Sequence, residues 1–160
     1  MRLYLPATMP LLAEWLAAGQ ATPGLAGAVT PGLREWYREG DAEELEYAAQ
    51  RVAARMSLQM LAAQPEVPRR RVVLAVDVPD ADVAVLDEPR GAVAVGAATA
   101  RASWASAFVD DEEADVVVSA AATALGGAAG GDDDASFAVD EAEGTELGWY
   151  AVQELEHLFG

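Results

Sequence analysis

One apolar stripe at helical spacing, in the segment after Asp41, constrains the fold of this chain more than any other feature. The stripe consists of Leu45, Ala49, Val52, Met56 and Met60. Steps of three and four residues are the period of an amphipathic α-helix. Asp41 and Glu44 have capping-box spacing at one end, and Pro65 closes the other end. The sequence therefore predicts a helix over residues 41–64 that buries one face against another layer.

A continuous apolar run over residues 72–76 follows, bounded by arginines and by Pro79. Its length and valine content favour a central β-strand that is covered on both faces. Other apolar or alternating runs predict strands at 2–5, in a hairpin within 83–95, and at 104–109. We expect Pro6 to end the first of these strands.

Capping signals predict further helices in the N-terminal part. Thr8 and Thr30 precede helical segments with a proline in the first turn, and these helices are expected to end at Gly19 and Gly40. The stretch 20–29 between them is rich in Gly, Ala and Pro and is predicted to be a loop.

The C-terminal part has similar signals. A helix is expected to begin at Asp110 or Asp111 and to be broken by the glycines of 126–131, which would form a flexible loop. A short strand is predicted at 137–139. Asp140 begins a capping box, so a last helix is expected to run from there to Leu158.

The order of these elements groups the strands in the middle of the chain, between helices. It predicts an α+β single domain over residues 1–160, with a mixed or antiparallel central sheet and helices packed mainly on one face. A ferredoxin-like variant is the first topology considered, and a doubly wound α/β sheet is the alternative. A chain of 160 residues has the usual length of one domain.

The charge of the chain is strongly negative. It has 27 acidic residues against 10 arginines, a formal net charge of −17. Residues 102–160 hold 14 of the acidic residues and no Lys or Arg. Such a chain repels phosphate backbones and anionic lipids, so we expect no direct nucleic-acid binding and no membrane partner.

The residue types that are missing narrow the chemistry. The chain has no Cys, and His157 is its one histidine, which excludes thiolate catalysis and metal sites built from Cys and His. We expect no catalytic residue, no cofactor and no metal, and these absences favour a protein that is not an enzyme. Lys, Asn and Ile are also absent, which suggests a GC-rich bacterial gene. No signal-peptide pattern or long apolar run is found, so a cytoplasmic location is expected.

Two segments hold the residues considered for interaction or for lining a pocket. One is the turn after the central strand, since ligands of α/β sheets bind beyond the carboxyl ends of strands. The other is the polar and aromatic segment near the C-terminus. These candidate residues are Asp77, Asp80, Asp82, Glu143, Glu146, Trp149, Tyr150 and Gln153. The simpler interpretation of the three aspartates is turn formation.

Other clusters have simpler structural interpretations. The acids of 110–115 and 132–134 lack the spacing of a calcium loop and suit helix starts or solvated loops. The aromatic pair Trp36–Tyr37 suits core packing, with an interface as the alternative. The arginines of 69–71 are expected to pair with the protein's own acids.

Several stretches of the chain resemble a known family. They read MRLYLPAT at the start, AVTPGLREWY at 28–37, GDAEELEYAA at 40–49, VVLAVDVPDADV at 72–83 and FAVDEAEGTELGWYAVQEL at 137–155. Together they resemble a family of small acidic actinobacterial proteins, known as a domain of unknown function. The resemblance covers most of the chain and implies no activity, cofactor or catalytic residue.

Three functional hypotheses follow. The first is action through a protein partner or through self-association, because the usual nucleophiles and metal ligands are missing. The second is an acidic surface that binds a basic protein, as a nucleic-acid mimic would. The third is a carboxylate-based hydrolase, with or without Mg²⁺, at the turn of Asp77, Asp80 and Asp82.

Overall fold

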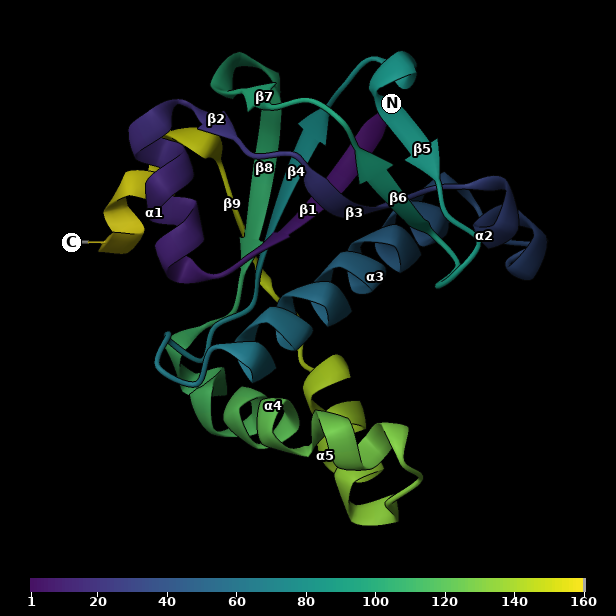
Figure 1. Ribbon diagram of the computed structural model, residues 1–160, viewed down its shortest axis with the longest axis vertical. Helices are drawn as coiled ribbons and strands as arrows, with labels where there is room; N and C mark the ends of the chain where they lie inside the picture. Colours follow the sequence, from purple (N-terminus) through teal and green to yellow (C-terminus); the bar gives the residue numbers. More distant parts are fainter. Residues whose placement is uncertain (160) are drawn as a thin grey trace.

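A seven-stranded sheet with the strand order β5-β6-β3-β1-β4-β8-β9 organises the protein (Figure 1). The structure is a computed structural model that describes residues 1–159, with the backbone alone described at 126–129. The strands of this sheet are β1 (Arg2–Ala7), β3 (Gly24–Ala28), β4 (Val72–Asp77), β5 (Val83–Val85), β6 (Ala92–Val95), β8 (Trp104–Val109) and β9 (Gly148–Tyr150). A small second sheet pairs β2 (Gln20–Ala21) with β7 (Thr99–Ala100).

The helices lie around this sheet. The α-helices are α1 (Met9–Ala18), α2 (Pro31–Trp36), α3 (Ala42–Ala63), α4 (Asp115–Ala129) and α5 (Asp133–Glu143). The 3-10 helices are η1 (Asp80–Asp82), η2 (Arg101–Ser103), η3 (Glu112–Ala114) and η4 (Val152–Phe159). Among residues 1–159, no helix is both long enough and apolar enough to cross a bilayer.

Every strand pair of the large sheet is antiparallel. The predicted α+β class with an antiparallel sheet is therefore confirmed, and the doubly wound alternative is wrong. Since β3 and β4 both pair with β1, they are parallel to each other, and the α2–α3 segment joins them in one split βαβ unit. A ferredoxin-like fold has two such units, but β8 and β9, joined by α4 and α5, are direct antiparallel neighbours. The ferredoxin-like variant is thus not confirmed.

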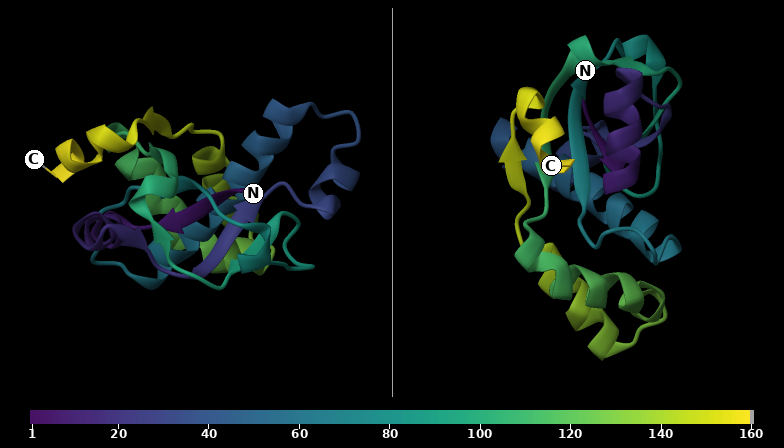
Figure 2. Two further views of the ribbon diagram at one scale, coloured as in Figure 1. Left: turned by 90° about the horizontal axis from the view of Figure 1, so that it is seen from above. Right: turned by 90° about the vertical axis from the view of Figure 1, so that its left-hand side faces the viewer.

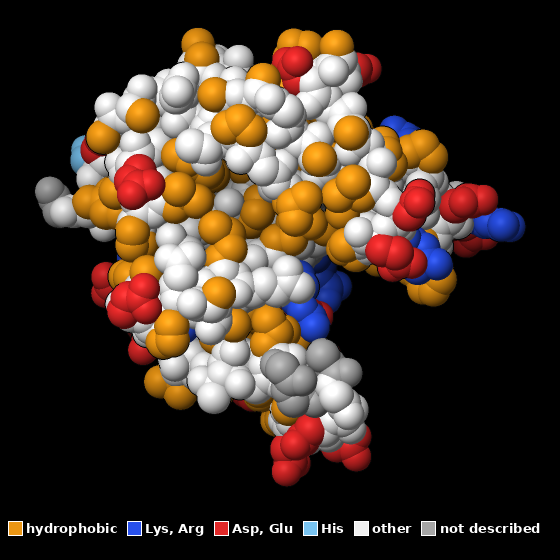
Figure 3. All heavy atoms as spheres, in the orientation of Figure 1, with side chains coloured by type: hydrophobic (Ala, Val, Ile, Leu, Met, Phe, Trp, Pro, Cys, Tyr) orange, Lys and Arg blue, Asp and Glu red, His pale blue; other side chains and the backbone are white. Residues whose placement is uncertain are grey.

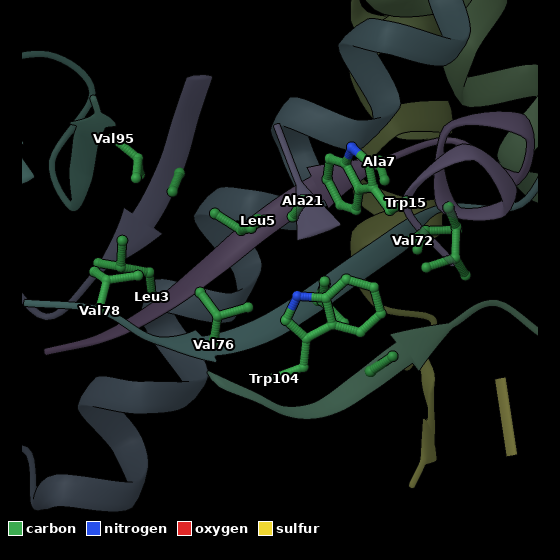
Figure 4. Packing of buried hydrophobic residues seen from close by; sticks show 14 of the residues in the cluster. Leu3, Leu5, Ala7, Trp15, Ala21, Val72, Val76, Val78, Val95 and Trp104 are labelled. Atoms are coloured by element: carbon green, nitrogen blue, oxygen red, sulfur yellow. The ribbon is translucent and has the colours of Figure 1, made fainter. Parts of the chain in front are cut away.

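Helices cover both faces of the sheet, so the prediction that they pack mainly on one face is wrong. On one face α3 packs against Tyr4, Val73 and Ala75. On the other face α1 adds Trp15 to a cluster with Leu5 and many other buried residues (Figure 4). The reason is that apolar side chains of β1 and β4 point alternately to the two faces and are buried on each, as expected for strands covered on both sides.

The N-terminal helix starts are confirmed, but the loop predicted at 20–29 is wrong. Thr8 and Thr30 cap α1 and α2 through hydrogen bonds from backbone N–H groups, and Gly19 ends α1 with φ of 70°. Within 20–29, however, β3 lies between β6 and β1. Its small residues are a packing requirement, because α3 crosses directly over this strand.

Pro6 lies inside β1 and pairs with Val73, so the prediction that it ends the strand is wrong. β3 pairs with β1 at Leu3 and Tyr4 alone. Beyond these residues β1 has one strand neighbour, which is the edge-like setting in which proline is tolerated.

The C-terminal third differs most from the prediction. The helix of 115–129 continues through most of the glycine-rich stretch. Asp132 then caps α5, so the strand predicted at 137–139 and the helix predicted at 140–158 are both wrong. Beyond α5 the chain becomes extended, forms β9 at the edge of the sheet and ends in η4.

The helices α4 and α5 form an antiparallel pair that projects away from the sheet, and we call it the α4–α5 arm (Figures 1 and 2). The arm is attached to the C-terminal half of α3. Leu58 and Leu61 of α3 pack there against Val118 and Ala121 of α4 and Val139 of α5. One long helix thus supports both the sheet and the arm.

A buried hydroxyl joins α3 to the two central strands. Ser57 Oγ donates to the Ala7 carbonyl oxygen at 2.7 Å and accepts from the Val72 N–H at 3.1 Å. Ser57→Ala leaves both backbone groups buried without this partner, so we expect the free energy of unfolding to fall by about 1–3 kcal/mol. Chemical denaturation measures this, with Ser119→Ala on α4 as the control. An equal, small effect of the two substitutions would contradict the assigned role of Ser57.

Candidate binding groove

The structure does not bring the aspartates after the central strand together into a site. Asp77 accepts a hydrogen bond from Arg2 Nε at 2.8 Å, and this bond holds the pKa of Asp77 below its usual value. The Asp80 side chain is 88% exposed, and Asp82 lies at the end of η1. Within residues 1–159, no group of three or more His, Cys, Asp or Glu side chains is arranged to hold a metal ion. The geometry gives the hydrolase hypothesis no support.

The C-terminal candidates are dispersed as well. Trp149 is 61% exposed on the edge strand β9, whereas Tyr150 packs against the core cluster of α1. Glu146 is exposed in the linker before β9, and Gln153 is exposed on η4. Glu143 is the exception, because it ends α5 beside two arginines of α3.

The other clusters have structural roles. The predicted pairing of the arginines of 69–71 with acids is confirmed for Arg71, which pairs with Asp110, and for Arg70, whose Nη1 lies 4.0 Å from Glu112. It is wrong for Arg69, which donates to carbonyl oxygens at the end of α3. The acids of 132–134 form the cap and first turn of α5. His157 is exposed on η4.

A groove of about 450 Å³ lies between α2, α3, the turn after β5 and the end of α5. Its apolar surface includes Leu25, Leu33, Val52 and Met56. Its aromatic and charged lining consists of Trp36, Tyr37, Arg51, Arg55, Arg90 and Glu143. We call this site the aromatic–arginine groove. Its volume lies within the range of ligand-binding clefts, about 300–1,000 Å³.

Two of the arginines belong to α3 and share one carboxylate. Arg51 and Arg55 are one turn apart, so their like charges disfavour the helix unless a counter-charge lies nearby. Arg55 Nη1 donates to Glu143, and Arg51 Nη2 lies 3.7 Å from the same carboxylate. Two guanidinium groups thus face one carboxylate, and a positive charge remains.

The third arginine comes from the opposite wall of the groove. The guanidinium carbon of Arg90 lies 4.2 Å from the ring centroid of Trp36, within the range of a cation–π contact. Gly91, with φ of 86°, forms the turn that brings Arg90 to this position. In the described part of the chain, Arg90 makes no ion pair. Its N–H donors are therefore available to a ligand.

The aromatic residues of the groove are exposed, so the prediction of core packing for Trp36–Tyr37 is wrong. Trp36 is 64% exposed and Tyr37 is 40% exposed. The helix α2 has six residues and buries Leu33 alone. Residues three and four apart share a helix face, so both rings lie on the side of Leu33 and line the groove there instead of entering the core.

Charge is distributed unevenly around the groove. Basic side chains gather in the hollow between the body of the protein and the α4–α5 arm, whereas acidic side chains cover the outer end of the arm (Figure 3). The lining offers guanidinium donors, aromatic faces and apolar surface, with Glu143 as its one carboxylate. Chemically, this arrangement suits an anionic group that is attached to an apolar body.

The comparisons with known proteins agree with the resemblance seen in the sequence. The chain belongs to the Family of unknown function (DUF6912), whose model matches residues 1–159. No match was found among curated proteins or among solved structures. The resemblance to a domain of unknown function is thus confirmed, and the family itself assigns no activity.

Proposed function

We propose that this chain is a non-enzymatic binding protein that holds an acidic, partly apolar segment of a partner protein in the aromatic–arginine groove. One observation carries the proposal. Three of the ten arginines of a chain with a net charge of −17 lie around one groove, next to two exposed aromatic side chains.

The composition of the groove supports a protein partner. Trp, Tyr and Arg are the residue types that contribute most to binding at protein interfaces, whereas most other surface residues contribute little. Trp36 and Arg90 are stacked before any partner arrives. This contact fixes two long side chains in advance, which lowers the entropy lost on binding.

The charge of the groove supports an acidic segment. Three arginines and one carboxylate leave an excess of two positive charges (three minus one) in a strongly negative molecule. Arginine binds carboxylates through paired N–H groups and stacks on aromatic rings. A segment with carboxylates on either side of an apolar or aromatic side chain satisfies both properties.

The test is the binding of a short fluorescent peptide in which one phenylalanine is flanked by aspartates, followed by fluorescence anisotropy. We expect the wild-type protein to bind it and Arg90→Ala to bind it at least about tenfold more weakly, a loss of about 1.4 kcal/mol. Arg101→Ala is the matched control, since Arg101 pairs with Glu156 outside the groove.

A second peptide with lysines in place of the aspartates separates specific binding from attraction to the acidic surface. Its binding should fall steeply with salt and should be unaffected by Arg90→Ala. Equal binding of the acidic peptide to wild type and to Arg90→Ala, or no binding to either, would overturn the proposed function.

A further inference from the structure

We propose that the partner is a second copy of this chain, and that α5 of each copy enters the aromatic–arginine groove of the other. This inference rests on the proposed function and names its partner. The chemistry that the groove selects, carboxylates around an aromatic side chain, is present on the outer face of α5.

The outer face of α5 is acidic with one large apolar side chain at its centre. Phe137 is 69% exposed. Asp133 and Asp134 lie one turn before it, and Asp140 and Glu141 lie one turn after it, and all four are exposed. Residues three and four apart share a helix face, so the five side chains form one surface. We call this surface the acidic face of α5.

The same helix already supplies a carboxylate to the groove within one chain. Glu143, at the end of α5, contacts Arg51 and Arg55. One end of the groove therefore already binds a carboxylate that comes from an acidic helix. Its other end, around Arg90 and Trp36, has a cation without an ion-pair partner in the described part of the chain.

The position of the arm allows the contact to be reciprocal. The α4–α5 arm projects from the body, and basic side chains are visible in the hollow beside it (Figure 3). A two-fold axis that sets the acidic face of each α5 against the groove of the other protomer would make the contact reciprocal. An exchange of this kind closes after two copies, and the acidic peptide then competes with the second copy for the groove, so peptide binding is measured on dilute, monomeric protein.

The net charge sets the conditions under which this dimer forms. Two chains of −17 each repel one another at long range. At an ionic strength of about 0.15 M the Debye length is about 8 Å, so this repulsion is screened more strongly than ion pairs in direct contact. We therefore expect the dimer at physiological salt and a weaker dimer at low salt.

The experiment is sedimentation velocity of the full chain at physiological salt over a range of concentrations. Wild type should sediment as a concentration-dependent dimer. Arg90→Glu and Asp140→Arg should each weaken the dimer at least tenfold, since each places like charges at both contacts. Phe137→Ser should also weaken it, through the lost apolar contact. Glu66→Arg is the matched control, because Glu66 is exposed and lies outside both surfaces.

Mixing the two charge variants gives the decisive result. In a mixed dimer of Arg90→Glu and Asp140→Arg, both contacts again join opposite charges, one of them reversed. The mixture should therefore dimerise better than either variant alone. Circular dichroism of each variant establishes that it is folded.

Three outcomes would overturn the inference. They are a monomeric wild type at all concentrations, a dimer that is unchanged in Arg90→Glu and Asp140→Arg, and no recovery on mixing. A monomer that still binds the acidic peptide through Arg90 removes the second copy as partner and leaves the proposed function in place. Loss of peptide binding removes the proposed function itself.

Discussion

Asp110→Ala is expected to lower the free energy of unfolding by about 3–5 kcal/mol, because it leaves a buried guanidinium without its counter-charge. Asp110 is fully buried and the Arg71 side chain is 2% exposed. The two carboxylate oxygens each accept from Arg71 at 2.8 Å, through Nε and Nη2. The Arg71 backbone N–H donates to the same carboxylate at 2.8 Å.

This pair joins segments that are distant in the sequence. Arg71 immediately precedes β4, and Asp110 immediately follows β8. Arg71 Nη2 also donates to the Thr145 carbonyl oxygen at 3.0 Å, in the linker between α5 and β9. Losing the carboxylate therefore disturbs the attachment of the arm as well as the sheet.

Urea denaturation measures the effect, and two comparisons identify its cause. Asp77→Ala breaks the exposed pair with Arg2 and should lower the free energy of unfolding by less than about 1 kcal/mol. The double variant Asp110→Leu with Arg71→Met removes both charges and should be more stable than Asp110→Ala. Similar losses for Asp110→Ala and Asp77→Ala would contradict the assigned role of the buried pair.

The elements that could be predicted from the sequence are those fixed by local signals. The caps at Thr8, Thr30 and Asp41 and the apolar stripe of the long helix depend on neighbours within a few residues. The all-apolar run of 72–76 similarly indicates a strand that is buried on both faces. These signals depend little on distant segments, so they can be interpreted from the sequence alone.

The elements that could not be predicted depend on contacts with distant segments. The glycines and alanines of 24–28 have the composition of a loop, yet they form an inner strand because α3 lies against them. The spacing of Asp140 and Glu143 also fits a helix start. In the structure, however, the helix begins earlier in the chain, where Asp132 caps it. Composition alone does not distinguish these alternatives.

The groove escaped the sequence analysis for a similar reason. Its side chains come from α2, α3, the turn after β5 and the end of α5. One local signal was present: Arg51 and Arg55 stand one turn apart on a helix, which requires a counter-charge from elsewhere. Of the eight interaction candidates, Glu143 lies in the groove, as do Trp36 and Tyr37, for which an interface was the alternative interpretation.

Gly27→Ala is expected to lower the free energy of unfolding by about 3 kcal/mol or more, because the added methyl group has no space. A Cβ at Gly27 would overlap the Ala49 carbonyl oxygen and lie 3.2 Å from the Ala53 nitrogen. Both atoms belong to the backbone of α3, so no side-chain rotation relieves the contact. The helix would have to move away from the sheet.

Gly24→Ala is the matched control, because it lies in the same strand and a Cβ there meets nothing within 4 Å. Its effect should stay within about 0.5 kcal/mol. Near-equal stability of the two variants in urea denaturation would contradict the close approach of α3 to β3. A displaced α3 also carries Arg51 and Arg55 away from Arg90, which belongs to the turn after β5. Folded Gly27→Ala protein should therefore bind the acidic peptide more weakly than Gly24→Ala protein, although neither glycine lines the groove.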